Sequence, residues 1–173
     1  MALSVGILAI ITLVLVGMYG GVSFSPGGPA DGQVIATDVT GGLQKAAPLV
    51  GFPVVIPAGL PDGWTPNSFS FTAAPGSAAQ PAAARAGWLT PQGRFITLVQ
   101  SGGAVTDVLT AELGAAAPPN GTVQVGGQQW TVTTGRRSEQ AWVRTAGGVS
   151  YLITGSASAD DFRALAAQIP TAG

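Results

Sequence analysis

The 173-residue chain lacks two residue types on which many catalytic and metal sites depend: it contains no cysteine and no histidine. Without cysteine there is no disulfide, no thiol nucleophile and no thiolate metal ligand. Without histidine the chain loses the commonest general base and the commonest ligand of transition metals. We therefore expect no metal site and no cofactor.

Charged residues are also scarce. They make up 9% of the chain, against about 25% in an ordinary globular domain. Seven basic and eight acidic residues give a net charge of -1. Because phosphate binding needs a clustered excess of basic residues, we expect no nucleic-acid partner. A surface with so few charges suits contact with a membrane or with another protein.

The first 30 residues carry no charge at all, since the first charged residue is Asp31. Residues 2–22 (ALSVGILAIITLVLVGMYGGV) form one apolar run, and a helix needs roughly 20 such residues to cross about 30 Å of hydrocarbon. The run predicts a transmembrane anchor in residues 1–24 that contacts the lipid bilayer through residues 2–22. A cleaved signal peptide is the alternative, but no basic residue precedes the run and no A-x-A site follows it.

Two features of this segment concern its orientation and packing. The first basic residue after it is Lys45. The positive-inside rule, which compares the basic residues on the two sides of a span, therefore gives little information on its orientation. The N-terminal tail is negligible, which favours translocation of the large C-terminal part, and we expect the domain outside the cytoplasm. Gly17 and Gly21 form a G-x-x-x-G pair, which allows close helix packing. Alternatively, these glycines only reflect a glycine-rich sequence.

Residues 25–50 are interpreted as a linker followed by a short helical or irregular segment, and residues 51–173 as an α+β domain. Alternation predicts a strand over residues 67–72. Turn residues predict hairpins over residues 86–100, 122–134 and 141–154. Residues 75–84 are low in complexity and predict an exposed loop.

Two helices are predicted within the domain. Apolar residues at positions 105, 108, 109 and 113 indicate a helix from Val105 to Leu113. Ser158 to Asp161 resembles a capping box and predicts a helix that continues through Ile169. Hairpins with two helices and no repeated βαβ units indicate an α+β fold with a mainly antiparallel sheet.

Candidate interaction residues are few. Of four tryptophans, those in or beside strand-like segments are interpreted as core residues: Trp88, Trp130 and Trp142. Trp64 follows a turn and remains a candidate for binding a glycan, a lipid or a protein. Arg136 and Arg137 form the only basic pair, which could contact an anionic lipid headgroup or an acidic partner. A solvated hairpin tip is the alternative for this pair.

No catalytic residues are identified, because no paired carboxylates and no activated nucleophile are evident. Five stretches carry a resemblance instead: Gly59-Leu-Pro-Asp-Gly-Trp-Thr-Pro66, Gly87-Trp-Leu-Thr-Pro-Gln-Gly93, Leu98-Val-Gln-Ser101, Gly121-Thr-Val-Gln-Val-Gly-Gly-Gln-Gln-Trp130 and Gly155-Ser-Ala-Ser158. In this order they resemble an actinobacterial family of single-span membrane proteins, domain-of-unknown-function family 4245, over nearly the whole chain. The resemblance implies an actinobacterial envelope protein with its domain outside the cytoplasm. It brings no known activity, and the basic residues that usually precede the span are missing here.

These observations favour a non-enzymatic accessory or interaction protein of the cell envelope. It would be a subunit of a larger membrane complex whose partner is another membrane or envelope protein. The alternative is an extracytoplasmic domain that binds or senses lipid or cell-wall material. An apolar pocket of several hundred Å³ would favour the alternative, and a flat, poorly charged sheet face would favour the accessory protein.

Overall fold

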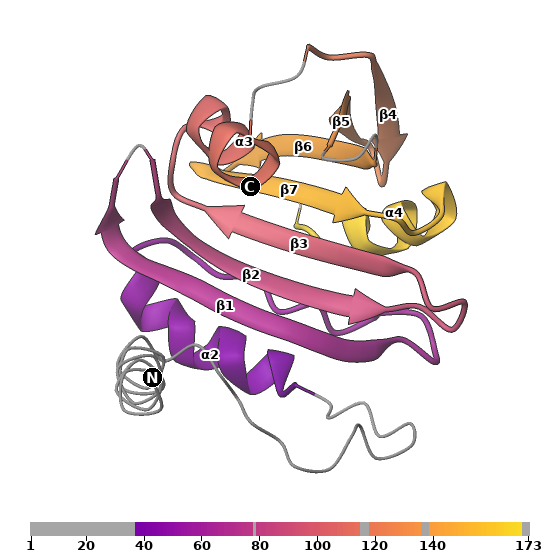
Figure 1. Ribbon diagram of the computed structural model, residues 1–173, viewed down its shortest axis with the longest axis horizontal. Coiled ribbons are helices and arrows are strands. Elements are labelled where there is room, and N and C mark those ends of the chain that lie inside the picture. Colours follow the sequence, from indigo (N-terminus) through magenta and orange to yellow (C-terminus); the bar gives the residue numbers. More distant parts are fainter. Residues whose placement is uncertain (1–36, 78, 115–117, 136–138, 171–173) are drawn as a thin grey trace, which may run out of the picture. The chain divides into compact units, whose positions relative to one another are not determined.

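The computed structural model describes residues 37–77, 79–114, 118–135 and 139–170, which form three helices and seven strands (Figure 1). The helices are α2 (Val39–Val50), α3 (Val105–Leu113) and α4 (Ala159–Ala166). The strands are β1 (Thr65–Gly76), β2 (Pro81–Leu89), β3 (Phe95–Ser101), β4 (Gly121–Val125), β5 (Gln128–Thr134), β6 (Gln140–Ala146) and β7 (Val149–Gly155).

All seven strands belong to one antiparallel sheet with the order β1-β2-β3-β7-β6-β5-β4. Two meanders, β1 to β3 and β4 to β7, meet at the β3–β7 pair, where Leu98 lies opposite Ile153. The chain leaves β3 through α3 and enters the second meander at the far edge of the sheet, in β4. The predicted α+β class with an antiparallel sheet is confirmed.

The larger hydrophobic core lies on the face of the sheet that α2 and α4 cover (Figure 1). The strands contribute three tryptophans to it, and each is at most 3% exposed: Trp88, Trp130 and Trp142. The interpretation of these three residues as core residues is therefore confirmed. We call this side of the sheet the core face.

Helix α2 shows that the stretch around residues 40–49 is helical rather than irregular. Its buried residues recur along one side of the helix: Val39, Leu43, Ala46 and Val50. Asp38 begins the helix by accepting a hydrogen bond from the backbone N–H of Gly41 at 2.8 Å. Gly42 lies so close to the Phe69 ring that a Cβ there would stand 2.6 Å from a ring carbon. The absence of a side chain at Gly42 thus lets α2 approach β1.

Helix α4 begins with the predicted capping box, in which Ser158 and Asp161 bond each other's backbone N–H groups. Its buried Phe162 packs on Trp142, with ring centroids 5.2 Å apart. The helix ends at Ala166, three residues before the predicted end at Ile169. Ile169 is still buried, because the turn that follows the helix keeps it against the core.

The irregular segment over residues 52–64 is fixed to the core by two glutamines. Gln100, which is fully buried on β3, exchanges two hydrogen bonds of 2.7 Å with the backbone of Val55. Gln168 likewise bonds both backbone groups of Gly59, at 2.9 and 3.0 Å. These hydrogen bonds take the place of the backbone hydrogen bonds that this segment would form if it were a strand of the sheet.

The opposite face of the sheet packs on α3 through a smaller cluster. It consists of Val108 and Leu109 of the helix with strand residues Ala83, Val99, Ala141, Val143 and Leu152. The helix has the predicted bounds of Val105–Leu113.

One predicted loop is wrong. Residues 75–84 are predicted to be exposed, but Pro81 to Ala84 begin β2 and are buried. Strand β2 lies between β1 and β3, and its alanines fit beneath α2 and α3 because they are small. Low sequence complexity here reflects close packing and not exposure.

The predicted transmembrane segment, residues 2–22, lies outside the described residues. Among the described residues, no helix has the length and apolar character that crossing a membrane requires.

Candidate functional site

Trp64 lies at the rim of a hollow between α2 and the irregular segment. The hollow has a volume of about 310 Å³, and the apolar side chains that contribute to its lining are Val39, Leu43, Ile56, Leu60, Trp64 and Trp88. Three prolines also line it, together with Thr40, Ala58, Asp62 and Gly63. Trp64 is half-buried, whereas Trp88 is almost wholly covered. The hollow thus offers one accessible indole beside one acidic group.

Two further hollows lie at other places on the described surface. One of about 440 Å³ lies near Phe52, Pro75, Gly103 and Asp107. The other has a volume of about 410 Å³, and the described residues that line it are Gln92, Arg94, Ser156, Ser158 and Asp161. Neither of them contains a tryptophan, so the Trp64 hollow is the one that matches the predicted aromatic site.

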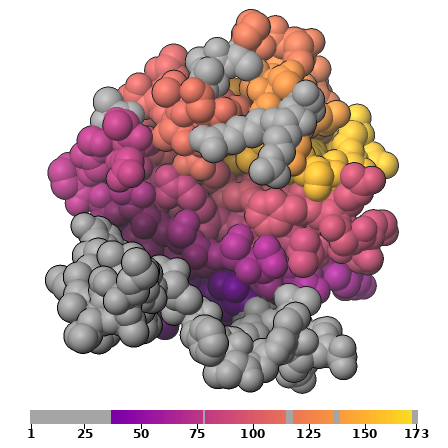
Figure 2. Space-filling view, in the orientation of Figure 1, coloured from indigo at the N-terminus to yellow at the C-terminus, as the bar shows by residue number. Residues whose placement is uncertain are grey.

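The face of the sheet that carries α3 has an unusual surface composition. We call it the hydroxyl face, because the strand register places short uncharged polar side chains on it in rows. The exposed or half-buried members are Ser68, Ser70, Thr72, Thr97, Thr122, Gln124, Gln129, Thr131 and Thr145. Figure 2 shows α3 beside the strands β1 to β3 on this side of the molecule. Among the described strand residues of this face, Arg85 is the one charged residue.

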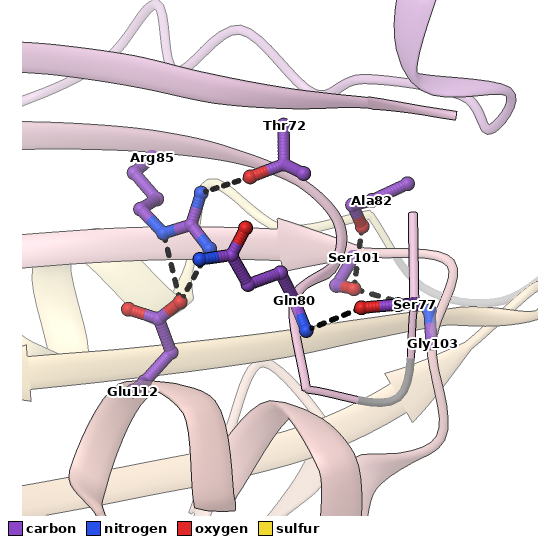
Figure 3. Close-up of polar contacts among 8 residues, drawn as sticks. All are labelled: Thr72, Ser77, Gln80, Ala82, Arg85, Ser101, Gly103 and Glu112. Carbon is purple, nitrogen blue, oxygen red and sulfur yellow. Dashed lines mark hydrogen bonds and ion pairs between the residues drawn. The ribbon is translucent and has the colours of Figure 1, made fainter. Parts of the chain in front are cut away.

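The charge of Arg85 is neutralised within the domain (Figure 3). Its Nε donates to Oε1 of Glu112 at 2.7 Å, and one terminal nitrogen lies 2.7 Å from the same oxygen. The other terminal nitrogen donates to the hydroxyl of Thr72 at 3.1 Å. Both charged side chains are mostly covered, at 23% and 17% exposure. The pair therefore fixes the C-terminal end of α3 to β2 and leaves no free charge at this point of the face.

We expect Glu112→Gln to lower the free energy of unfolding by about 1–2 kcal/mol, because it leaves the half-buried guanidinium of Arg85 without a counterion. The matched control is Asp160→Asn in the pair with Arg163, whose side chains are 94% and 50% exposed. That change should cost about 0.5 kcal/mol or less. Urea denaturation of both variants measures the difference, and equal losses would contradict the anchoring role of Glu112.

A second arginine, Arg144, lies buried on the core face and is 8% exposed. Its guanidinium carbon is 5.9 Å from the centroid of the Trp130 ring, and one terminal nitrogen donates to the carbonyl of Pro170 at 3.1 Å. Tyr151 lies opposite Arg144 on β7. Burial raises the pKa of the Tyr151 phenol, and the positive charge of Arg144 acts against this rise. The phenol therefore remains neutral at physiological pH.

The structure describes only one of the predicted interaction residues. Trp64 is at the rim of its hollow, while Arg136, Arg137, Gly17 and Gly21 lie outside the described residues. Arg85, Glu112 and Arg144 were not singled out from the sequence. The sequence does contain a signal for Arg144. Side chains alternate between the two faces of a strand, so Arg144 points to the same face of β6 as Trp142, two residues earlier. If Trp142 is a core residue, this alternation places a cation in the core.

No group of three acidic residues that could hold a metal ion occurs within the described ranges. The polar side chains of the described residues form ion pairs or hydrogen bonds to the backbone, which stabilise the packing, or they lie on the surface. The arrangement is suited to binding through the hydroxyl face or at the Trp64 hollow.

Comparison with known proteins places the chain in a family without providing an activity. No curated protein and no solved structure matches it. The family model described as "Protein of unknown function (DUF4245)" matches residues 1–169. Since this match covers nearly the entire sequence, the chain belongs to the family DUF4245.

Proposed function

We propose that this chain is a non-enzymatic accessory protein of the actinobacterial cell envelope and a subunit of a larger membrane complex. In this proposal residues 2–22 anchor it in the membrane as a single span, and the α+β domain lies outside the cytoplasm. The hydroxyl face binds another membrane or envelope protein. The observation that carries the proposal is that the described strand residues of that face present no unpaired charge.

The physical argument concerns desolvation. A charged side chain loses strong hydration when a partner covers it, whereas hydroxyl and amide groups lose less and can re-form hydrogen bonds across the interface. Interface centres are accordingly depleted in charged residues. Serine, threonine and glutamine side chains on the strands meet this requirement, and the internal ion pair of Arg85 removes the one exception among the described strand residues.

Helix α3 extends the same surface. Its exposed residues include Thr106 and Thr110, and the hydroxyl of Thr110 is bonded to the carbonyl of Thr106 at 2.8 Å. A partner docked on the hydroxyl face would therefore contact Thr106 and Thr110 on the helix, beside the half-buried Asp107, and uncharged side chains on the strands next to it. Anchoring both proteins in one membrane would raise their effective concentration, so that a weak contact could persist.

The test is co-purification of the full-length protein from native membranes in mild detergent. We expect it to be isolated with another membrane protein in fixed stoichiometry. Ser70→Lys combined with Gln129→Lys places two charges on the hydroxyl face and should reduce recovery of the partner at least about tenfold, which corresponds to about 1.4 kcal/mol. Gln44→Lys, on the exposed side of α2, is the matched control and should leave recovery unchanged.

Thermal unfolding of the three variants must show that each is folded. If the double variant retains its partner as well as the control does, the hydroxyl face is not the interface. If the wild-type protein is isolated alone in several mild detergents, and crosslinking in cells finds no neighbour, the subunit proposal itself fails. A reporter fused after Gly173 that is active in the cytoplasm would contradict the proposed orientation.

The Trp64 hollow supports a second candidate function, the binding of lipid or cell-wall material. Its volume of about 310 Å³ is at the lower end of the range for small-molecule sites. A half-buried indole beside apolar residues provides a stacking surface for a sugar ring or an acyl chain. A shift of tryptophan fluorescence on adding lipid vesicles or cell-wall fragments, lost in Trp64→Ala, would favour this candidate.

A further inference from the structure

Three buried side-chain nitrogens in the described part of the chain have no hydrogen-bond partner. They are the indole nitrogens of Trp130 and Trp142 and one terminal nitrogen of Arg144. All three are donors, and one belongs to a permanent cation. A group of buried donors without an acceptor requires an explanation, because each such group costs about 1–3 kcal/mol and a charged one costs more.

The three side chains occupy one patch of the core face. Trp142 and Arg144 are two residues apart on β6, so they point to the same side. Trp130 lies on the neighbouring strand, one position beyond the pair Thr131 and Val143, which places it opposite Arg144. Such neighbours have Cβ atoms about 4.5–5.5 Å apart. The unpartnered donors therefore belong to three side chains that are neighbours on the same face of the sheet.

Among the described residues, no carboxylate forms an ion pair with Arg144. The ion pairs found in the described ranges are Arg85 with Glu112 and Arg163 with Asp160, both at other sites. The neighbouring Tyr151 carries a neutral phenol, as its raised pKa requires. The carbonyl of Pro170 accepts one hydrogen bond from the guanidinium but brings no negative charge. A buried cation with one neutral acceptor is electrostatically incomplete.

We propose that this patch is a binding site for a small oxyanion, a phosphate or a carboxylate, held between strands β5 and β6 beside the carbonyl of Pro170. Arg144 provides the charge and a free N–H group, and the indole N–H groups of Trp130 and Trp142 flank it. A planar guanidinium matches the oxygens of carboxylate and phosphate groups. The site is on the core face, so it is independent of the partner proposed for the hydroxyl face.

The test measures binding of inorganic phosphate and of acetate to the full-length protein in detergent, with chloride replacing either anion at constant ionic strength. Equilibrium dialysis gives the stoichiometry, and tryptophan fluorescence reports on the two indoles at the site. We expect one anion per chain, a fluorescence change that saturates, and a rise of the unfolding midpoint by about 4 °C or more at a hundredfold excess over the Kd. Comparing the two anions decides between phosphate and carboxylate.

Arg144→Met should abolish both responses, while Arg94→Met, which removes an exposed arginine, should keep them. If Arg144→Met does not fold, Trp142→Phe provides a milder test, because it keeps an aromatic ring and removes only one donor. It should weaken binding about tenfold, the loss expected for one hydrogen bond to an anion. Absence of binding of either anion to the wild-type protein would overturn the proposal, as would unchanged binding in the folded Arg144→Met or Trp142→Phe variant.

Discussion

Trp130→Ala is expected to lower the free energy of unfolding by about 3–5 kcal/mol, the range for truncating a buried aromatic residue. The ring is 0% exposed and lies in the larger core, with Arg144 stacked against it. Removing it leaves a cavity under a sheet whose seven strands share one set of core contacts. Guanidinium denaturation of the domain, monitored by circular dichroism, measures the loss.

The matched control is Trp64→Ala. This residue is half-buried and packs only against the edge of the same core, so its loss should be clearly smaller, about 1–2 kcal/mol. A loss below about 1 kcal/mol for Trp130→Ala would mean that the ring is accessible in solution. The interpretation of Trp130 as a core residue would then have to be abandoned.

The hairpins of the domain could be predicted because their signals are local. Gly126 and Gly127 have φ values of 56° and 77°, and Gly147 and Gly148 have 56° and 76°. Two consecutive residues with positive φ are what a two-residue hairpin turn requires. The adjacent strands therefore pair where the sequence indicates, with Val125 opposite Gln128 and Ala146 opposite Val149.

The strand order and strand β2 could not be predicted in the same way. Pairing of β3 with β7 joins residues that are 49 to 59 positions apart, from Ser101 with Ser150 to Ile96 with Gly155, and no local pattern encodes it. The alanines of β2 have low strand propensity, yet helices lie on both faces of the sheet at this strand, where small side chains allow close packing. Tertiary packing overrides propensity at this strand.

The candidate sites also differ in whether a local sequence signal reveals them or only the paired strands do. A tryptophan after a turn could be recognised from the sequence, and Trp64 does lie in a hollow. The hydroxyl face could not be recognised, because it is assembled from one to three residues of each of five strands whose register is set by long-range pairing. That Arg144 has no ion pair among the described residues is likewise visible only after the strands are paired. Gly17, Gly21, Arg136 and Arg137 remain predictions.

A substitution at Gly155, at the end of β7, is expected to have the second large effect on stability. Gly155 has a φ of 143° and lies directly against the backbone of β3: a Cβ there would collide with the carbonyl oxygen of Phe95 and stand 3.0 Å from the Cα of Ile96. The same carbonyl of Phe95 accepts hydrogen bonds from the backbone N–H groups of Ser156 and Ala157, at 2.9 and 3.2 Å. This contact fixes the connection that leads from the sheet into α4.

We expect Gly155→Ala to lower the free energy of unfolding by about 3 kcal/mol or more, because backbone strain and a collision with backbone atoms add together. Gly148→Ala is the control: Gly148 also has a positive φ, 76°, but a Cβ there meets nothing within 4 Å. It should cost about 1 kcal/mol, the effect of the left-handed conformation alone. Chemical denaturation of both variants separates the two contributions. Equal losses would show that β7 and β3 do not approach closely at this point, and the proposed anchoring of α4 through Phe95 would then be wrong.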